Sequence, residues 1–288
     1  MFDIQVLSNL FMNEILSVEG LTKIFAKKGF FDSNSQALTA VDDVSFSLNE
    51  NEILAIAGQS GSGKSTIAKL ILGALEADSG KIFFDGAEVS NSSDLKRLRM
   101  ECQMVYQDPY DSINPRMRIS DIINEPLEIH GIGTKESRKK IVLDALRQVK
   151  LEPAHDIAKK YPHMLSGGQR QRAVIARALV VKPRIIIADE PVSMLDVSIR
   201  VEILELMNEI QQKNKISFIY ITHDLATAKH FADRIIILFA GKIVETGSID
   251  NVLTKPVHPY TKALIEAISE PDPSNLYKEK NISWQVDK

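Results

Sequence analysis

The residues in this sequence best suited to chemistry form one glycine-rich loop, which matches the pattern GxxxxGK[ST]. Its members are Gly58, Gln59, Ser60, Gly61, Ser62, Gly63, Lys64, Ser65 and Thr66. The glycines allow the backbone to curl so that successive N–H groups point at phosphate oxygens. Lys64 would supply positive charge to the terminal phosphates, and the Ser65 hydroxyl can ligate Mg²⁺. An apolar strand before the loop and a helix after it complete the pattern, which predicts a nucleoside triphosphate site rather than a plain Gly/Ser-rich turn.

Two acidic residues, Asp189 and Glu190, directly follow the apolar run 184–188. A buried strand does not ordinarily end in adjacent acids unless a cation or a water needs them. Asp189 can hold Mg²⁺ through its hydration shell. Glu190, which points elsewhere on an extended chain, can orient the attacking water as general base. Alone, such a pair is often only an exposed strand terminus, but beside the phosphate-binding loop it predicts catalysis.

A second helix start with anion-binding character follows in the chain. It consists of Leu165, Ser166, Gly167, Gly168 and Gln169. Ser166 is a favourable N-cap residue, and the two glycines expose backbone N–H groups at the N-terminus of the helix. By itself this segment is an ordinary N-cap turn. Two anion-binding helix starts in one chain, however, require a further explanation.

The elements that position these motifs are predicted to be alternating strands and helices. Alternation of apolar and polar residues over 14–49 predicts antiparallel strands, separated by a polar loop at 27–36. Further strands are expected at 53–57, 184–188 and 217–222 and as a pair flanking Gly241, with helices at 64–74, 168–180, 198–212 and 225–232. Strands that alternate with helices indicate a parallel sheet with crossover connections.

Residues 108–160 carry mostly helical patterns. These are expected to be broken by Pro109, Pro115, Pro126 and Gly131. The clearest helix covers 137–149, and its basic residues are interpreted as a solvated face rather than a binding patch. The segment 108–160 is therefore a candidate helical lobe.

Composition is that of an ordinary soluble globular protein, since 25% of the 288 residues are charged and 44% are apolar. A net charge of −3 argues against a protein held to nucleic acid by a basic surface. The single cysteine, Cys102, excludes an internal disulfide, a Cys-rich zinc site and a four-thiolate iron–sulfur cluster. No apolar run reaches about eighteen residues, and no basic residue precedes Lys23, so neither a membrane-spanning helix nor a secretory signal is expected. The expected location is the cytosol or the cytosolic side of a membrane.

With these motifs in this order, the sequence resembles the ATP-binding subunits of ABC transporters, whose LSGGQ signature residues 165–169 match at every position. The resemblance covers about residues 14–272. It implies an α/β P-loop NTPase fold of the ABC type, with a RecA-like parallel sheet core, an antiparallel β subdomain and an α-helical subdomain over about 108–178. In the family, the signature of one subunit closes over the γ-phosphate held by the loop of its partner. A dimer with two ATP sites is therefore implied.

The resemblance also gives roles to residues outside these motifs. Phe25 stands where the family places an aromatic residue that stacks on adenine, although a core Phe on a strand is the alternative. Gln107 matches the Q-loop glutamine, which contacts Mg²⁺ and the attacking water and senses the transmembrane subunit. Asp196 matches the D-loop aspartate at the dimer interface, and His223 matches the switch histidine that contacts the γ-phosphate. ATP and Mg²⁺ are the implied cofactors, with Ser65, Gln107 and Asp189 as the implied Mg²⁺ residues.

Two stretches resemble the oligopeptide, dipeptide and nickel importer branch of the family. The first is QDPYDSINPR after Gln107, which has SINPR for the more usual SLNPR, and the second is the C-terminal motif KPVHPYTKAL at 255–264. The D-loop reads SMLD rather than SALD, and neither departure removes a reactive group. The chain is thus expected to consist of an N-terminal tail, 1–12, an ABC ATPase domain, 13–248, and a C-terminal extension of oligopeptide-importer type, 249–288.

The resemblance implies an ATP-hydrolysing subunit that powers solute uptake, with peptides as the first cargo and oligosaccharides or nickel as alternatives. The implied partners are a second ABC ATPase in a heterodimer (a homodimer in isolation), two transmembrane permease subunits and, indirectly, a substrate-binding protein, but no nucleic acid. The subunit would lie peripherally on the cytoplasmic face of the cell membrane. A soluble ABC ATPase without a transport role is the alternative of another class, and a non-hydrolysing half of an asymmetric pair is a third.

Overall fold

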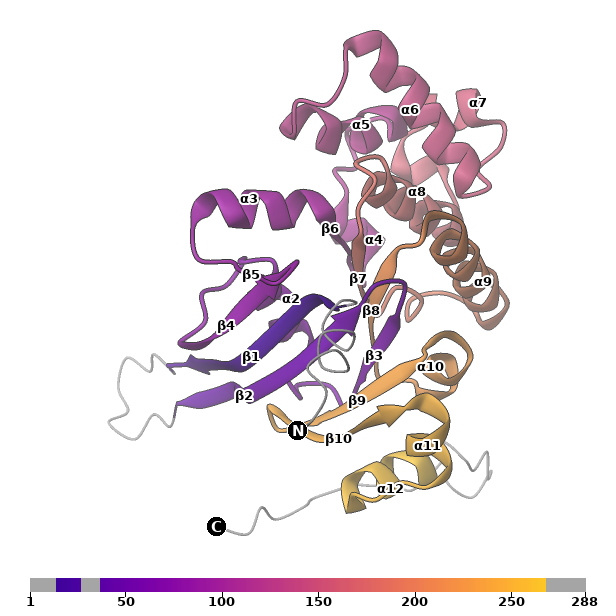
Figure 1. Ribbon diagram of the computed structural model, residues 1–288. Coiled ribbons are helices and arrows are strands. Elements are labelled where there is room, and N and C mark those ends of the chain that lie inside the picture. The colour runs from indigo at the N-terminus through magenta and orange to yellow at the C-terminus, as the bar shows by residue number, and fades with distance from the viewer. Residues whose placement is uncertain (1–13, 27–36, 268–288) are drawn as a thin grey trace, which may run out of the picture.

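The computed structural model describes residues 14–26 and 37–267, without the side chains of Tyr110 and Asp111. Figure 1 shows an antiparallel sheet and a larger, mostly parallel sheet, with a helical lobe beyond them at the top of the view. This arrangement confirms the predicted α/β fold class. The tail 1–12, the loop 27–36 and the end of the C-terminal extension lie outside the described residues, and the domain boundaries stay predictions.

The larger sheet has six strands in the order β10-β9-β3-β8-β7-β6. Their bounds are Ile53–Ala57 for β3, Cys102–Val105 for β6, Ile185–Asp189 for β7, Ser217–Thr222 for β8, Arg234–Phe239 for β9 and Lys242–Ser248 for β10. Every pair is parallel except β9 with β10. All residues of β3, β7 and β8 are buried, which is why these strands are nearly continuous apolar runs. The strands predicted for this sheet are confirmed, and β6 is a further strand that the sequence did not predict.

The smaller sheet has the order β2-β1-β4-β5 and is antiparallel throughout. The predicted pair is β1, Glu14–Phe25, and β2, Leu38–Asn49. The two other strands, β4 at Ser79–Phe84 and β5 at Ala87–Glu88, were not predicted. Two apolar clusters cover the two faces of the parallel sheet, and alternate residues of β3 belong to each. Leu54 and Ile56 lie in the cluster that joins this face to the antiparallel sheet, and Ala55 and Ala57 lie in the cluster on the opposite face.

Helices follow most strands. They are α2, Lys64–Ile71; α3, Ser92–Glu101; α9, Val197–Asn214; α10, Leu225–Phe231; α11, Ile249–Thr254; and α12, Pro259–Glu266. Helix α2 ends three residues before the predicted bound at Ala74, because Gly73 takes a φ of +60° that leaves the helical region. Within 14–26 and 37–267, none of the helices combines the length and the apolar character that crossing a bilayer requires.

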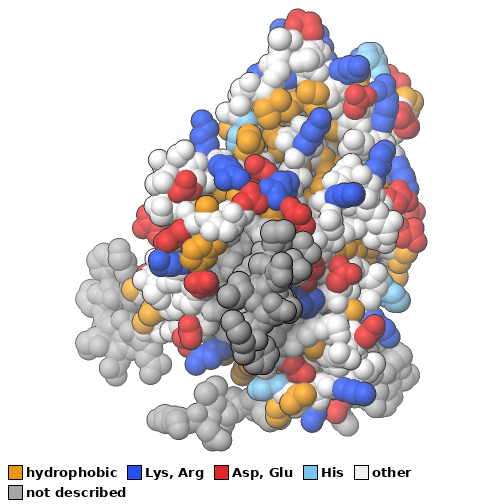
Figure 2. Space-filling model, viewed as in Figure 1, with side chains coloured by type: hydrophobic (Ala, Val, Ile, Leu, Met, Phe, Trp, Pro, Cys, Tyr) orange, Lys and Arg blue, Asp and Glu red, His pale blue; other side chains and the backbone are white. Residues whose placement is uncertain are grey.

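The helical lobe consists of α4, Pro109–Ser112; α5, Ile119–Ile129; α6, Lys135–Gln148; α7, Ala154–Lys159; a 3₁₀ turn, Pro162–Met164; and α8, Gly167–Leu179. The prediction that Pro126 breaks a helix is wrong, because Pro126 lies inside α5. Burial of Ile122, Ile123 and Leu127 against the lobe stabilises α5 enough to tolerate the missing N–H of the proline. On the face shown in Figure 2, Lys and Arg side chains are interspersed with those of Asp and Glu.

Candidate functional site

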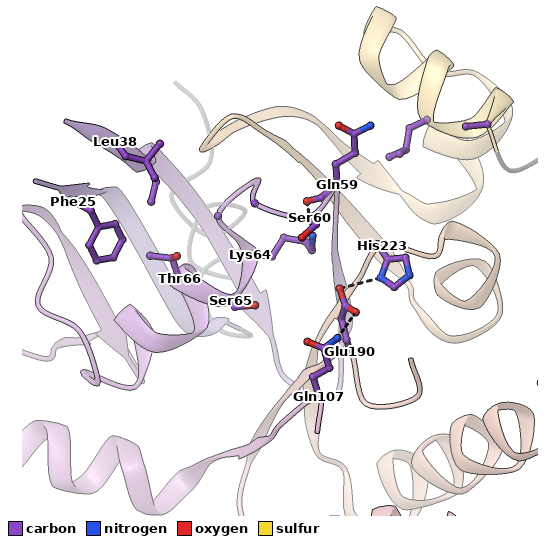
Figure 3. Close-up of a pocket in the computed structure, with 15 residues that line it drawn as sticks. Phe25, Leu38, Gln59, Ser60, Lys64, Ser65, Thr66, Gln107, Glu190 and His223 are labelled. Atoms are coloured by element: carbon purple, nitrogen blue, oxygen red, sulfur yellow. Dashed lines mark hydrogen bonds and ion pairs between the residues drawn. The ribbon is translucent and has the colours of Figure 1, made fainter. Parts of the chain in front are cut away.

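A cavity of about 790 Å³ lies where the carboxyl ends of the parallel strands meet the edge of the antiparallel sheet. The glycine-rich loop after β3 supplies most of its floor, through residues 59–61 and 63–66. Glu190 enters the cavity after β7 and His223 after β8, while Gln107 follows β6. Parallel strands therefore bring together residues that are far apart in the sequence (Figure 3).

The loop is held tightly between two strands, and its glycines permit this approach. Gly63 has a φ of +108°, and a Cβ atom there would collide with the carbonyl oxygen of Ala40 on β2. A Cβ atom on Gly58 would collide in the same way with the carbonyl oxygen of Leu238 on β9. The curled backbone expected from the sequence thus depends on positions that only glycine can occupy.

Lys64 is only 5% exposed, and its Nζ donates hydrogen bonds to the carbonyl oxygens of Gly58 at 2.7 Å and Gln59 at 2.8 Å. Burial lowers the pKa of Lys64, against the opposing effect of the nearby carboxylates of Glu190 and Asp189. The loop itself therefore holds its cation at the floor of the cavity, close to where the terminal phosphates would lie.

Ser65, Gln107 and Asp189 line a second cavity of about 360 Å³, and the first two residues also line the main cavity. Burial is the main cause that raises the pKa of Asp189, although a hydrogen bond from the Ser65 hydroxyl acts in the opposite direction. The Oδ1 atom of Asp189 is buried without a hydrogen-bond partner among the described residues. An unpaired carboxylate oxygen beside a hydroxyl and an amide fits a hydrated, oxygen-ligated cation such as Mg²⁺.

Glu190 lies between Gln107 and His223. Gln107 Nε2 donates to Glu190 Oε2 at 3.2 Å, and His223 Nδ1 lies 3.0 Å from Glu190 Oε1, as the dashed lines in Figure 3 show. The expectation that Glu190 lies on an extended chain is wrong, because its φ is +47°. A left-handed conformation is uncommon for a residue other than glycine, and here it turns the chain out of the sheet directly after Asp189.

The segment Leu165–Gln169 lies apart from this cavity, since none of its residues is among the described residues that line it. Part of the segment serves its own helix: the Gln169 N–H donates to Ser166 Oγ at 3.3 Å, and the Ser166 N–H donates to Gln169 Oε1 at 3.1 Å. A Cβ atom on Gly168 would lie only 2.7 Å from Ile199 Cγ2, whereas on Gly167 its nearest contact, Leu195 Cδ2, would be at an ordinary 3.5 Å. Packing within the chain thus requires Gly168 but not Gly167.

Of two further candidates, Phe25 lines the main cavity and Asp196 does not. Asp196 is the exposed N-cap residue of α9, its side chain makes no capping hydrogen bond, and it does not line the main cavity. Phe25 lines the cavity beside Leu38, away from His223 (Figure 3). The Phe25 side chain is 38% exposed, with Lys23 Nζ at 5.8 Å from its ring centroid. This exposure favours a stacking surface over the alternative of a core Phe on a strand.

Several residues that line the cavity could not be predicted from the sequence. Leu38 and Ala40 come from β2, and Leu264 and Ala267 come from the region of α12. The motif 255–264 contains Leu264 but not Ala267, and from the sequence it is interpreted only as a mark of family branch. In the structure this motif forms part of the site.

Comparison with known proteins gives two matches to family models. A model described as "ABC transporter" matches residues 41–193. A model described as "Oligopeptide/dipeptide transporter, C-terminal region" matches residues 244–287. Together the two matches cover the glycine-rich loop, the LSGGQ segment, the acidic pair and the C-terminal motif.

Individual relatives agree with these matches. The oligopeptide transport ATP-binding protein OppF of Bacillus subtilis is 42% identical over 273 residues, which are 93% of this chain and 88% of the relative. Among solved structures, cbiO1 of Clostridium perfringens, described as part of the ABC transporter complex cbiONQ, superposes with a TM-score of 0.73 at 26% identity over 92% of this chain and 96% of its own. An ATP-binding cassette solved as a dimer bound to ADP and Pi superposes with a TM-score of 0.69 at 27% identity, over 81% of this chain and 98% of its own.

Proposed function

Because this chain belongs to the ABC transporter ATP-binding family, we propose that it is the ATP-hydrolysing subunit of an importer that takes up peptides. ATP binding and hydrolysis coupled to transport are the activities of the family. The match of the C-terminal region and the similarity to an oligopeptide transport protein support peptides over oligosaccharides or nickel. The observation that carries the catalytic part is the position of Glu190, within hydrogen-bond reach of Gln107 and His223 beside the phosphate-binding loop.

ATP fills the main cavity with its base at Phe25 and its phosphates on the loop 58–66. Lys64 turns from the loop carbonyls to the terminal phosphates, and Glu190 orients the attacking water as general base. Gln107 and His223 orient Glu190 before ATP arrives and contact the water and the γ-phosphate once it is bound. Mg²⁺, held by Ser65, Gln107 and Asp189, would neutralise charge on the phosphates.

The separation of Leu165–Gln169 from the main cavity supports a composite site, in which this segment serves the ATP of a second subunit. That subunit is a second ABC ATPase in a heterodimer, and isolated chains can pair as a homodimer through the same surfaces. Asp196, exposed at the start of α9, lies at this dimer interface. The pair binds two transmembrane permease subunits on the cytoplasmic face of the membrane, and a substrate-binding protein supplies the cargo.

Replacing Gly167 with alanine tests the composite site. We expect the fold to be unchanged, because the new methyl group meets only an ordinary contact at 3.5 Å. Hydrolysis in the assembled dimer should fall about tenfold, as the methyl group intrudes on the partner's γ-phosphate. Gly168→Ala is the matched control, since its methyl group would clash with Ile199 at 2.7 Å and should instead lower the free energy of unfolding. Full hydrolysis by Gly167→Ala would contradict the assignment.

Replacing Phe25 with alanine tests the position of adenine. Loss of one base–aromatic stack should weaken ATP binding about tenfold, with little change in binding of inorganic triphosphate, which has no base. Leu38→Ala removes apolar surface from the same end of the cavity without removing a ring, and it should have a smaller effect. Isothermal titration of both ligands measures the difference. Equal losses for ATP and triphosphate would place adenine elsewhere.

The transport role is tested by purifying tagged protein from its source membranes in mild detergent and identifying the associated chains. Two polytopic membrane proteins and a second ATPase would support the importer, and an associated binding protein would then reveal the cargo. Recovery from the soluble fraction alone, with no polytopic partner, would favour an ABC ATPase without a transport role. Phosphate release with and without the second ATPase separates a catalytic subunit from a non-hydrolysing half.

A further inference from the structure

The C-terminal extension contacts the phosphate-binding loop directly through Tyr260. The backbone N–H of Gln59, the second residue of the loop, donates a hydrogen bond to the Tyr260 hydroxyl at 3.0 Å. Tyr260 is only 3% exposed, and its ring packs on Phe239 with a centroid distance of 4.3 Å. The hydroxyl is therefore held in place by a buried aromatic ring rather than by a mobile surface side chain.

Neighbouring residues of the extension fix the helix that carries Tyr260. Glu245 of β10 accepts hydrogen bonds from the backbone N–H groups of Val257 at 2.8 Å and His258 at 3.0 Å. His258 is the N-cap residue of α12, and its Nδ1 accepts from the Tyr260 N–H at 3.1 Å. Residues 257–260 thus anchor α12 to β10 of the mostly parallel sheet.

Helix α12 also contributes to the wall of the main cavity. Leu264 lies one helical turn after Tyr260, and both it and Ala267 line the cavity. In Figure 3 the yellow C-terminal helix lies on the Gln59 side of the cavity, away from Phe25 and Leu38. The extension is therefore built into the nucleotide site at the end that receives phosphate.

A glycine-rich loop needs such support, because glycine loses more backbone entropy on ordering than any other residue. Residues outside the loop hold its backbone at two points: Gly241 N–H donates a hydrogen bond to the Ser62 carbonyl at 3.0 Å, and Gln59 N–H donates one to the Tyr260 hydroxyl. Fixing the curve before ATP arrives lowers the entropy lost on binding. We propose that Tyr260 is a positioning residue of the ATP site, through which the C-terminal extension sets the affinity of this subunit for ATP; this inference rests on the proposed function.

Tyr260→Phe tests the inference, because it keeps the ring on Phe239 and removes only the hydroxyl. We expect the Kd of the full-length chain for the non-hydrolysable ATP analogue AMP-PNP with Mg²⁺ to rise about fivefold, which corresponds to about 1 kcal/mol. The KM for ATP should rise by a similar factor while kcat stays within about twofold, since no catalytic group has moved. Tyr161→Phe is the control: it removes a hydroxyl that pairs with Arg118 in the helical lobe, and it should change neither constant.

Glu245→Gln provides a second variant that does not line the cavity. If Glu245 acts by anchoring α12, its substitution should raise the Kd, and the double variant should bind no more weakly than Tyr260→Phe alone. Provided that the wild-type chain binds AMP-PNP, two results would overturn the inference. One is an unchanged Kd for Tyr260→Phe, and the other is additive effects on the Kd in the double variant. A wild-type chain that failed to bind AMP-PNP would instead contradict the proposed function.

Discussion

Replacing Glu190 with glutamine is expected to reduce the rate of ATP hydrolysis by roughly 10²–10⁴-fold while ATP binding survives. The amide has the size of the carboxylate and can keep contacts with Gln107 and His223, which lie at 3.2 and 3.0 Å. It cannot, however, accept a proton from the attacking water. The expected fall in hydrolysis rate is therefore the contribution of general base catalysis. The loop and Lys64 still position the phosphates, so ATP binding is unaffected.

Single-turnover phosphate release measures the chemical step, and equilibrium titration with ATP measures binding. Glu209→Gln is a suitable control, because Glu209 is an exposed residue of α9 whose carboxylate pairs with Lys150 at 2.7 Å. It makes the same chemical change outside the cavity and should hydrolyse ATP at the wild-type rate. Unchanged turnover in Glu190→Gln would show that another group activates the water.

The buried strands could be predicted from the sequence because every residue in them is buried, so each strand is a continuous apolar run. Strands β3, β7 and β8 are buried at every position, so an apolar run marks each of them. Strand β4 begins with three exposed residues and only Phe84 is buried, and α3 buries only Leu98. Elements that expose most of their residues carry little periodic signal, so the segment 75–101 gave no prediction.

The same distinction applies to the site. The phosphate-binding loop and the LSGGQ segment are consecutive residues, and their types alone indicate their chemistry. The left-handed backbone of Glu190 and the hydrogen bond from Gln59 to Tyr260 depend on contacts between residues far apart in the chain. No local pattern encodes such contacts, so the sequence indicated which residues react but not how Glu190 or the loop is held.

Lys64 offers the second large effect, because it is the cation that the loop places under the phosphates. We expect Lys64→Met to weaken ATP binding by roughly 10²–10⁴-fold, since two charge-assisted hydrogen bonds to phosphate are together worth about 3–6 kcal/mol. Methionine keeps most of the apolar stem in the buried position but removes the charge and the donors to Gly58 and Gln59. Thermal unfolding without nucleotide separates this loss from any loss of stability caused by the unpaired carbonyls.

A charge-removing substitution elsewhere on the surface is the control for Lys64→Met. Lys96 is exposed on α3, so Lys96→Met makes the same change in charge without affecting binding. If Lys64→Met folds and still binds ATP with wild-type affinity, the phosphates do not lie on this loop, and the roles of Ser65, Asp189 and Glu190 fail with it. A loss confined to Lys64→Met would instead tie the phosphates to Lys64. Glu190, whose charge lies close enough to Lys64 to oppose the lowering of the lysine's pKa by burial, would then lie beside the phosphoryl group that it must help to transfer.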